Sequence, residues 1–556
     1  PATTTPAAGP PAAPTATPEP SHWTVGSLDE PASILPFSPD GRAAAPISQA
    51  IFPAPVLGLD YAYTTTGILR EIPTRANGGV EQRPVKGYLD ASGEYTTTVT
   101  QVPTTTDQLV VTFHWNPALR WADGQPVTAG DSVFAYDEAR RSPPSPEAEG
   151  LLELIERYEA VDGSTTRAFL KPGHSDPSYP LVAWPPAPRH LLQNATPEAR
   201  DRYARAPLGY GPYTFGESTP GKSITLIRNK FWPSKGLREQ LRFRFFGTAA
   251  ELRAAVTRGE VDVASLDRIP ADLYRILDQD AASGTTKVTF LQGPVSEHLD
   301  FNLDDPLLKD LRVRRAIAYA VDRQKLVDQL FGGKTAVLQS WIFPAQREYA
   351  GDEQLTRYRY DPAKASALLD AAGVKDTNGD GIREASGGKP ISMTILTADT
   401  PLAVEIGRRI EQNLRAVGLS LRTKALPVDA LYSPTGPLFR RQFQLAEFAW
   451  IGSVEPNGLP IWSCAAIPSQ ENGFTGNNFG GWCFDQAETA LRAAASTLDP
   501  RARAAAYLHQ QQFWTQQMPS LPLLQRPVAI LQHPGIDGVT PDPLAPLTWN
   551  VAAWKP

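Results

Sequence analysis

One stretch near the middle of the chain, residues 299–333, constrains the fold more than any other. Apolar and polar residues alternate over 299–303, as in a strand with one buried face, and the Asp-Asp-Pro turn that follows ends the strand. Asp310 can then cap a first helix, and Asp322 can cap a second helix that a Gly-Gly pair terminates. We interpret this stretch as the point where one lobe passes into another.

The same alternation of strands and helices occurs on both sides of this stretch. Before it, a strand pattern at 241–246, a helix pattern at 248–259 and a strand pattern at 261–264 form a βαβ-like unit. After it, further patterns lie at 361–373 (helix), 391–397 (strand), 401–417 (helix), 419–424 (strand), 443–450 (strand), 485–497 (helix), 500–517 (helix) and 527–532 (strand). These units predict an α/β fold with more than one lobe.

The length of the chain agrees with several domains, because 556 residues exceed what one hydrophobic core usually supports. The net charge is 53 − 59 = −6 and there is no long basic tract, which argues against a nucleic-acid partner. No apolar run approaches the roughly 18–20 residues that span a bilayer. We therefore expect a soluble protein of two or three domains.

Residues 1–22 differ in composition from the rest of the chain, since the first twenty are almost all Pro, Ala and Thr. Such a segment cannot form a core and predicts an extended, disordered linker. Linkers of this kind hold domains away from surfaces. We therefore expect a tether that carries a lipid anchor and is the protein's only contact with a membrane, and a terminus without a role is the alternative.

The only two cysteines, Cys464 and Cys483, lie close together in a loop-rich stretch. They can form one disulfide, which the loop-entropy treatment values at about 3 kcal/mol, or remain as two buried thiols. Two ligands without a nearby His do not build a zinc site. We favour the disulfide, which implies an oxidising, extracytoplasmic location.

Residues 216–223 match the phosphate-loop pattern G-x-x-x-x-G-K-[ST]. That loop needs a following helix whose N-terminus holds the phosphates, whereas an alternating, β-branched strand follows here at 224–229. Pro220 also removes one amide that could bind a phosphate. The pattern therefore predicts a hairpin turn with Lys222 in solvent, and not a nucleotide site.

Another pattern is typical of calcium binding. Asp376, Asn378, Asp380, Ile382 and Glu384 match the first part of an EF-hand loop, including its turn glycine. The twelfth position, where EF-hands place a bidentate glutamate, is a glycine, and a strand follows instead of a helix. A loop stabilised by its Asp and Asn side chains without metal is the alternative. A bound Ca²⁺ would be structural, and we expect no other cofactor.

Five motifs occur in order along the chain: LRWADGQPVTAGDSVFAYD, GYGPYTF, LRAAVTRGEVDVA, FNLDDPLLKDLRVRRAIAYAVDRQKLV and MPSLPLL. Together they resemble the dipeptide/oligopeptide-binding family (family 5) of the extracytoplasmic solute-binding proteins of ABC importers. The resemblance implies an α/β, two-lobed, periplasmic-binding-protein-like (type II) fold with an extra domain on lobe I. The implied parts are lobe I at 23–62, 203–295 and 513–556, the extra domain at 63–202, and lobe II at 296–512.

The resemblance also implies a function. Such a protein encloses a peptide or a similar small solute between its lobes by hinge closure, and it delivers this ligand to the permease subunits of an ABC transporter. It is not an enzyme. We expect a monomer in the periplasm or on the outer face of the plasma membrane.

The peptide-binding members of this family carry a W-x-x-D-x-x-x-P segment, whose Asp pairs with the amino terminus of the peptide. The corresponding segment here begins at Trp450 and is one residue shorter, with Ser453 or the shifted Glu455 in the place of the Asp. Glu455 can neutralise an ammonium group, whereas Ser453 cannot. The alternative is that Trp450 belongs to the core and Glu455 to a surface turn.

The other expected ligand contacts lie near the hinge or beside the cysteines: Phe301, Asn302, Tyr210, Trp462, Asn477 and Trp482. A disulfide would hold the glycine-rich loop between the cysteines near the ligand and reduce the freedom that binding removes. Ordinary packing is the alternative role for these side chains. Arg312, Arg314 and Arg315 we interpret as charges on a helix surface.

The competing class is a secreted carbohydrate-active protein, either an oligosaccharide binder or a glycosidase. Such proteins also combine a Pro/Thr linker, many tryptophans (12 here) and an acidic surface. A glycosidase would need two carboxylates about 5–9.5 Å apart across a cleft. The chain has no G-x-S-x-G and no H-E-x-x-H motif, and the five ordered motifs favour the binding protein.

Overall fold

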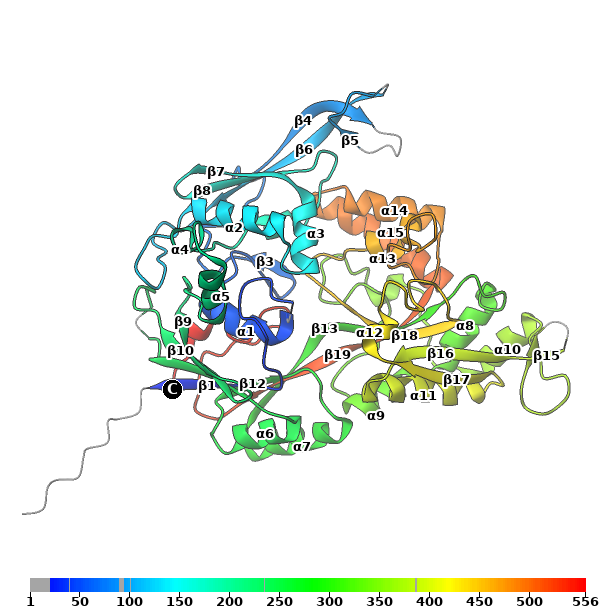
Figure 1. Ribbon diagram of the computed structural model, residues 1–556. Helices are drawn as coiled ribbons and strands as arrows, with labels where there is room; N and C mark the ends of the chain where they lie inside the picture. Colours follow the sequence, from blue (N-terminus) through cyan, green and yellow to red (C-terminus); the bar gives the residue numbers. More distant parts are fainter. Residues whose placement is uncertain (1–20, 40, 90–94, 101, 235, 386–387) are drawn as a thin grey trace, which may run out of the picture.

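Figure 1 shows the fold as a computed structural model, which describes all residues except 1–20, 40, 90–94, 101, 235 and 386–387. The linker predicted at 1–22 therefore lies almost entirely outside the described residues. None of the helices that the structure describes is long and apolar enough to cross a membrane.

A mixed ten-stranded sheet runs through the molecule (Figure 1). Its strands, in spatial order, are β17 (Ser420–Leu426), β16 (Ser392–Ala398), β18 (Leu445–Ile451), β13 (Lys287–Phe301), β19 (Ser520–Gln532), β12 (Val263–Leu266), β1 (His22–Ser27), β11 (Gln240–Phe245), β10 (Ser223–Arg228) and β9 (Tyr213–Thr219). We call the part with β1 and β9–β12 the first lobe, and the part with β16–β18 the second lobe.

Two long antiparallel strands, β13 and β19, join these lobes. The last residues of β19 pair with β12 in the first lobe, and the last residues of β13 pair with β18 in the second lobe. The register between β13 and β19 is interrupted between Gln292 and Ser296. Gly293 lies in this interruption, where a Cβ atom would come within 2.7 Å of the Arg526 carbonyl oxygen. The strands are thus irregular where they leave the first lobe.

Helices cover both lobes. In the first lobe, α6 (Ala249–Thr257) begins with a capping box between Thr248 and Glu251, and α7 (Ala271–Ser283) ends at the left-handed Gly284. The second lobe carries α8 (Leu311–Ala320), α9 (Arg323–Phe331), α10 (Pro362–Ala371) and α11 (Pro401–Arg415). Asp310 and Asp322 cap α8 and α9 as predicted.

The extra sheet of the molecule has five strands and lies at the top of Figure 1. Its spatial order is β5 (Tyr95–Thr96), β4 (Val80–Leu89), β6 (Pro103–His114), β8 (Thr165–Leu170) and β7 (Ile155–Asp162). Helix α2 (Ala129–Arg141) packs against β7 and β8 and starts with a capping box between Thr128 and Asp131. Helix α3 (Pro146–Leu154) follows it.

A third group of helices packs around tryptophans. It contains α13 (Leu459–Trp462), α14 (Asp485–Ala495) and α15 (Pro500–Gln517). Trp462, Trp482 and Trp514 are buried together there with Ile342 and Tyr507. This cluster supports one side of the candidate site described below.

The remaining elements are short or lie at the edges of the main units. They are α1 (Gly41–Ile51), β2 (Leu57–Leu59), β3 (Ala62–Thr64), α4 (Arg189–Leu192), α5 (Pro197–Arg205), β14 (Glu384–Ala385), β15 (Lys389–Pro390), α12 (Val428–Leu431) and four single 3₁₀ turns at Tyr179–Val182, Asp352–Gln354, Cys464–Ala466 and Val551–Ala553.

Three predictions about this architecture can be compared with the structure directly. The phosphate-loop pattern is the hairpin between β9 and β10, and Lys222 is exposed, as predicted. The strand predicted at 299–303 is only the end of the much longer β13. The surface interpretation of Arg314 is wrong: it is buried, and its guanidinium donates hydrogen bonds to the carbonyl oxygens of Leu308, Lys309, Gln517 and Met518.

Candidate ligand-binding site

A cavity of roughly 290 Å³ lies beside the second half of β13 and the first residues of β19. Its walls come from β13, from the loop after β18, from α13 and from the segment around Trp341, and every lining residue falls within 296–522. The cavity is therefore built on the second lobe and on the two strands that lead to it. Ligand sites in proteins are typically apolar hollows of this kind with a few placed polar groups.

Aromatic rings form much of the cavity wall. Trp341, Phe343, Trp450, Trp462 and Trp514 all line it. The ring of Trp450 is itself held between two others: it stacks on His298 at 5.9 Å and on Phe479 at 6.0 Å between ring centroids. Rigid rings of this type bury a large area of ligand at a small cost in side-chain entropy.

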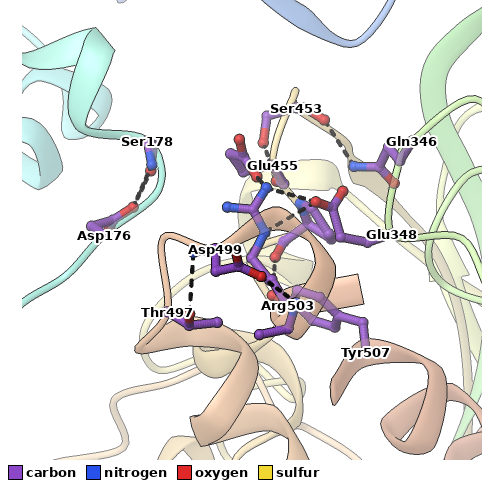
Figure 2. Close-up of polar contacts among 12 residues, drawn as sticks. Asp176, Ser178, Gln346, Glu348, Ser453, Glu455, Thr497, Asp499, Arg503 and Tyr507 are labelled. Atoms are coloured by element: carbon purple, nitrogen blue, oxygen red, sulfur yellow. Dashed lines mark hydrogen bonds and ion pairs between the residues drawn. The ribbon is translucent and has the colours of Figure 1, made fainter. Parts of the chain in front are cut away.

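Figure 2 shows a group of three charged side chains, which we call the loop triad and of which one member lines the cavity. It consists of Glu348, Arg503 and Glu455. Oε1 of Glu348 accepts hydrogen bonds from Nε and Nη2 of Arg503 at 3.0 and 2.6 Å, and Oε2 of Glu455 lies 2.7 Å from the same Nη2. With both carboxylates ionised, the loop triad carries a net negative charge.

Glu455 is the member of the loop triad that lines the cavity. Burial raises the pKa of its carboxyl group to about 7, although Arg503 opposes the shift, and the negative charge of Glu348 adds to it. The backbone around it is held firmly: Ser453 Oγ donates to the Glu455 carbonyl oxygen at 2.8 Å, and Gln346 Nε2 donates to the Ser453 carbonyl oxygen at 2.9 Å. The carboxyl group therefore has a fixed position and a charge that changes near neutral pH.

The loop triad faces the five-stranded domain. Figure 2 shows Asp176 and Ser178 on a separate segment opposite Glu455 and Arg503. The charge of Asp176 contributes to the raised pKa of Glu455, and the charge of Glu455 contributes to the raised pKa of Tyr63 after burial, which is the main cause. Residues of the N-terminal part of the chain thus come near this side of the cavity without lining it.

A second group, the strand triad, lies in the sheet beside the cavity and consists of Glu297, Arg526 and Glu447. Arg526 forms an ion pair with Glu297, which lines the cavity. Glu447 is fully buried, accepts a hydrogen bond from Thr397, and has a pKa far above its usual value because of burial and then because of the nearby Glu297 charge. Both causes favour the protonated form of Glu447.

The floor of the cavity also contains a buried histidine. His298 lines the cavity, and burial lowers the pKa of its imidazole to about 3, so the ring is neutral. Asp300 lies 3.6 Å from His298 Nε2, and burial raises the pKa of its carboxyl group to about 7. His298 therefore presents a polar, neutral ring to the cavity, and Asp300 is buried next to it on β13.

The structure brings five of the expected ligand contacts to the cavity: Trp450, Ser453, Glu455, Trp462 and Asn477. The other four, which do not line the cavity, are Phe301, Asn302, Tyr210 and Trp482.

Phe301 is fully buried in the core of the second lobe, on the same face of β13 as Leu299, because side chains alternate along a strand. Asn302 is also buried, and its amide donates to the carbonyl oxygens of Arg441 and Phe443. Both side chains therefore pack at the end of β13, and neither lines the cavity.

Tyr210 and Trp482 have packing roles as well. Tyr210 is fully buried against Phe52 and Trp121, and its hydroxyl donates to the Pro53 carbonyl oxygen at 3.1 Å. Trp482 packs in the tryptophan cluster next to Trp462. The alternative of ordinary packing fits both residues.

The two cysteines form the expected disulfide, Cys464–Cys483. It closes the loop that contains Asn477 and follows the cavity residue Trp462. Asn478 is buried within this loop, where its amide donates to the carbonyl oxygens of Ser463 and Trp482. The disulfide and these hydrogen bonds together fix one wall of the cavity.

Several cavity residues were not predicted from the sequence: Glu297, His298, Trp341, Phe343, Gln346 and Trp514. Only the first two had a usable signal, since they are two ionisable side chains in a row between Val295 and Leu299. Arg503 and Glu348, which lie behind Glu455, had none, because they are 155 residues apart.

A two-lobed α/β molecule with a ligand-sized cavity beside its connecting strands defines the class of two-lobed binding proteins. Residues 98–465 match the family model described as bacterial extracellular solute-binding proteins, family 5 (middle region). The chain belongs to this family.

Individual proteins support the same assignment. A provisionally named ABC transporter peptide-binding protein of Brucella ovis is 29% identical over 328 residues, which is 57% of each chain, so the present chain spans little more than half of that relative's length. The dipeptide-binding protein of Escherichia coli is 24% identical over 480 residues, covering 79% of this chain and 82% of its own.

Solved structures confirm the two-lobed α/β fold. The oligopeptide-binding protein AppA of Bacillus subtilis, in complex with a nonapeptide, has a TM-score of 0.68 at 21% identity and is covered over 99% of its length and 96% of this chain. NikA of Brucella suis, in complex with Fe(III)-EDTA, has a TM-score of 0.75 at 17% identity with the same coverage. At these identities the likeness concerns the fold alone.

Proposed function

We propose that this protein is the extracytoplasmic substrate-binding component of an ABC importer, and that it captures a small peptide or a similar solute in the cavity beside β13. The observation that carries the proposal is the aromatic cavity with Glu455 at its side. Family membership supports a solute-binding role, and the named relatives are peptide-binding proteins. The chain then acts by binding and releasing its ligand, without converting it.

The cavity favours a ligand that carries an ammonium group. Glu455 offers a carboxylate at the cavity wall, and the loop triad has more negative than positive charge. Trp450 and Trp341 supply aromatic faces, which attract cations as well as apolar groups. Ser453 and Asn477 add polar contacts at the same wall. We propose that Glu455 receives the amino terminus, or another ammonium group, of the ligand.

The charge of the cavity also argues against one ligand class found among the structural neighbours. Fe(III)-EDTA, bound by NikA of Brucella suis, is an anion, and it would meet the carboxylates of Glu455 and Glu297. Burying an anion against like charges is unfavourable. An oligosaccharide would suit the tryptophans, but it carries no positive charge to pair with the carboxylate of Glu455 or Glu297.

Ligand capture would proceed by closure of the two lobes. We propose lobe I at 23–62, 203–295 and 513–556, the extra domain at 63–202, and lobe II at 296–512, with the interrupted register near Gly293 as part of the hinge. The ligand first contacts lobe II, and Asp176 and Tyr63 then approach from the other side. Only contacts made in the closed state can shift the equilibrium toward it.

The role of a substrate-binding component also implies partner proteins. We propose that the closed, loaded form docks on the permease subunits of an ABC transporter, and that the protein works as a monomer outside the cytoplasm. The Pro/Thr/Ala composition of residues 1–22 supports a tether between a lipid anchor and the folded part.

Native mass spectrometry of the purified protein tests the proposal directly, because solutes that fill a preformed cavity often remain bound. A co-purified peptide, bound again by the emptied protein with a decrease in the radius of gyration in X-ray scattering, is the expected result. Hydrolysis of a glycoside by the purified protein, abolished by Glu455→Gln or Glu297→Gln, would overturn it.

A further inference from the structure

The loop between α10 and β14 is not part of the cavity. It runs through residues 376–384 in the second lobe, and none of its residues lines the cavity described above. Its Asp, Asn and Glu residues match the calcium-binding pattern of the sequence and lie outside the proposed ligand cavity. Its contacts nevertheless form an organised polar site.

The loop wraps its backbone around its own acidic side chains. The two oxygens of Asp376 accept hydrogen bonds from the N–H groups of Gly379 and Gly381, at 2.7 and 2.9 Å. Asn378 Oδ1 accepts from the Asp380 N–H at 2.8 Å, and Asp380 Oδ1 accepts from the Ile382 N–H at 2.7 Å. As a result, carboxylate oxygens of Asp376, Asp380 and Glu384 all lie within 4.8 Å of one another.

Glu384 provides an independent sign that something is bound here. Its side chain is only 3% exposed, unlike those of Asp376 and Asp380. Oε2 accepts from the N–H and the hydroxyl of Thr377, at 2.7 and 2.8 Å, but the buried Oε1 has no hydrogen-bond partner among the described residues. A buried carboxylate oxygen without a partner is costly, and its position beside two further carboxylates adds repulsion.

The neighbouring arginine does not neutralise this group. The guanidinium of Arg383 points away from it, to the carbonyl oxygens of Val417 and Val374 at 2.8 and 2.7 Å, and to the carboxylate of Asp370. Within the described part of the chain, none of the three carboxylates makes an ion pair. The charge of the site is therefore uncompensated by protein groups.

We propose that residues 376–384 bind a calcium ion. The ligands would be the carboxylates of Asp376, Asp380 and Glu384, the Asn378 side-chain oxygen and the Ile382 carbonyl oxygen, with water completing the shell. Ca²⁺ accepts six to eight oxygen ligands with flexible geometry, whereas Mg²⁺ requires a smaller octahedral site and keeps much of its water. An irregular set of five protein oxygens fits the larger ion.

The ion would hold together an edge of the second lobe. Lys375 and Glu384 pair through their backbones across the loop, and the Arg383 N–H donates to the Gly418 carbonyl oxygen at 2.8 Å, next to β17. Binding at this loop therefore couples α10 to the turn between α11 and β17. We expect Ca²⁺ to raise the thermal stability of the protein and to leave the affinity for the solute unchanged.

Calcium titration of the intact, EDTA-treated protein tests the proposal, with isothermal titration calorimetry for affinity and thermal melts for stability. We expect one Ca²⁺ per chain, a higher Tm in calcium than in EDTA, and no comparable effect of Mg²⁺. Asp380→Asn should weaken the Ca²⁺ affinity by at least about tenfold, since ligand charge sets affinity in such loops. In EDTA it should melt close to the wild type: it loses the acceptor of the Asn378 amide, but it removes one of the three repelling carboxylates and still accepts the Ile382 hydrogen bond.

The matched control is Glu353→Gln, which changes an exposed carboxylate of the same lobe outside the loop. It should keep the full calcium response. Glu384→Gln provides a second variant, which should lose Ca²⁺ binding while its buried amide retains the contact with Thr377. The proposal would be overturned by the absence of binding at millimolar Ca²⁺, or by wild-type affinity in both Asp380→Asn and Glu384→Gln.

Discussion

The loop triad and the strand triad have the same composition, two glutamates and one arginine, and each contributes one glutamate to the cavity wall. They differ in the partners of the second glutamate, which is buried in both triads. In the loop triad, Glu348 is buried but receives two hydrogen bonds from Arg503. In the strand triad, Glu447 is held by Thr397 and its pKa is raised far above the usual value, after burial also by Glu297.

This difference gives the two triads different electrostatic properties. In the strand triad Arg526 pairs with Glu297, and burial and the Glu297 charge raise the pKa of Glu447, whereas Glu455 of the loop triad titrates near pH 7. Identical residues thus acquire different charge behaviour through burial and hydrogen bonding. In our proposal the loop triad recognises the charge of the ligand, and the strand triad has a packing role.

The largest expected effect comes from removing the arginine of the loop triad. Arg503→Met leaves Glu348 and Glu455 close together without a cation, and we expect a loss of about 3–5 kcal/mol in the free energy of unfolding at neutral pH. Urea denaturation measures it. Arg501→Met is the control, since Arg501 is exposed on the same helix, and it should change stability by less than about 0.5 kcal/mol. Equal losses in the two variants would contradict the assignment.

The next effect is a pH dependence due to Glu455. Its pKa is raised from 4.5 to about 7 in the folded state, so its contribution to stability is fully present below about pH 4.5 and is lost as the pH rises to about 7. Glu455→Gln does not titrate. The variant should therefore gain about 2–3 kcal/mol relative to the wild type between these pH values.

Urea denaturation of both proteins across this pH range measures the difference. Glu353→Gln, on the exposed surface, should follow the wild type throughout. Parallel pH profiles for Glu455→Gln and the wild type would show that Glu455 titrates normally and that the two triads do not differ in the way we describe.

Ligand affinity provides a sharper comparison of the two triads. For the peptide that co-purifies, Glu455→Gln should weaken binding by about 10–100-fold, because it removes the charge that the ammonium group meets. Glu297→Gln should weaken it less, since the Glu297 charge is already paired with Arg526. Isothermal titration calorimetry gives both affinities. A larger loss in Glu297→Gln would transfer charge recognition to the strand triad.

The smallest expected effect is that of Arg526→Met on stability. Only one carboxylate, Glu297, loses its arginine, and the Arg526 side chain is 24% exposed against 6% for Arg503, so water can replace its contact more easily. We expect a loss of about 1–2 kcal/mol, the order for a polar group left without its partner. Denaturation in urea at pH 7 checks this value against that of Arg503→Met. A loss as large as that of Arg503→Met would mean that Arg526 compensates both glutamates, as Arg503 does.

Local sequence patterns were sufficient for most of the regular elements. The capping box at Thr128, the caps at Asp310 and Asp322, and the hairpin at 216–223 all depend on residues a few positions apart. The prediction failed for β13, where only the last residues were recognised as a strand. Gly293 and Pro294 interrupt the strand pattern, and Glu297 resembles a surface residue until Arg526, from a distant strand, is known to lie beside it.

The candidate site was predictable only in part, for a related reason. The segment from Trp450 to Glu455 could be recognised by its spacing, and the cysteines indicated the loop beside it. The sequence correctly predicts that the strand containing Phe301 runs past the site. The direction of the Phe301 side chain, however, depends on the pleat and register of β13. A motif identifies a segment more reliably than it identifies a side chain's direction.

The sequence by itself determined the α/β character, the helix caps, the disulfide candidates and the family. These properties depend on short-range periodicity, on turn chemistry and on the order of motifs. Only the tertiary structure decided which carboxylate meets which arginine. More than a hundred residues separate the partners in each pair, Glu348 from Arg503 and Glu297 from Arg526. Their pairing, and the pKa values that result from it, depend on burial, which no local pattern encodes.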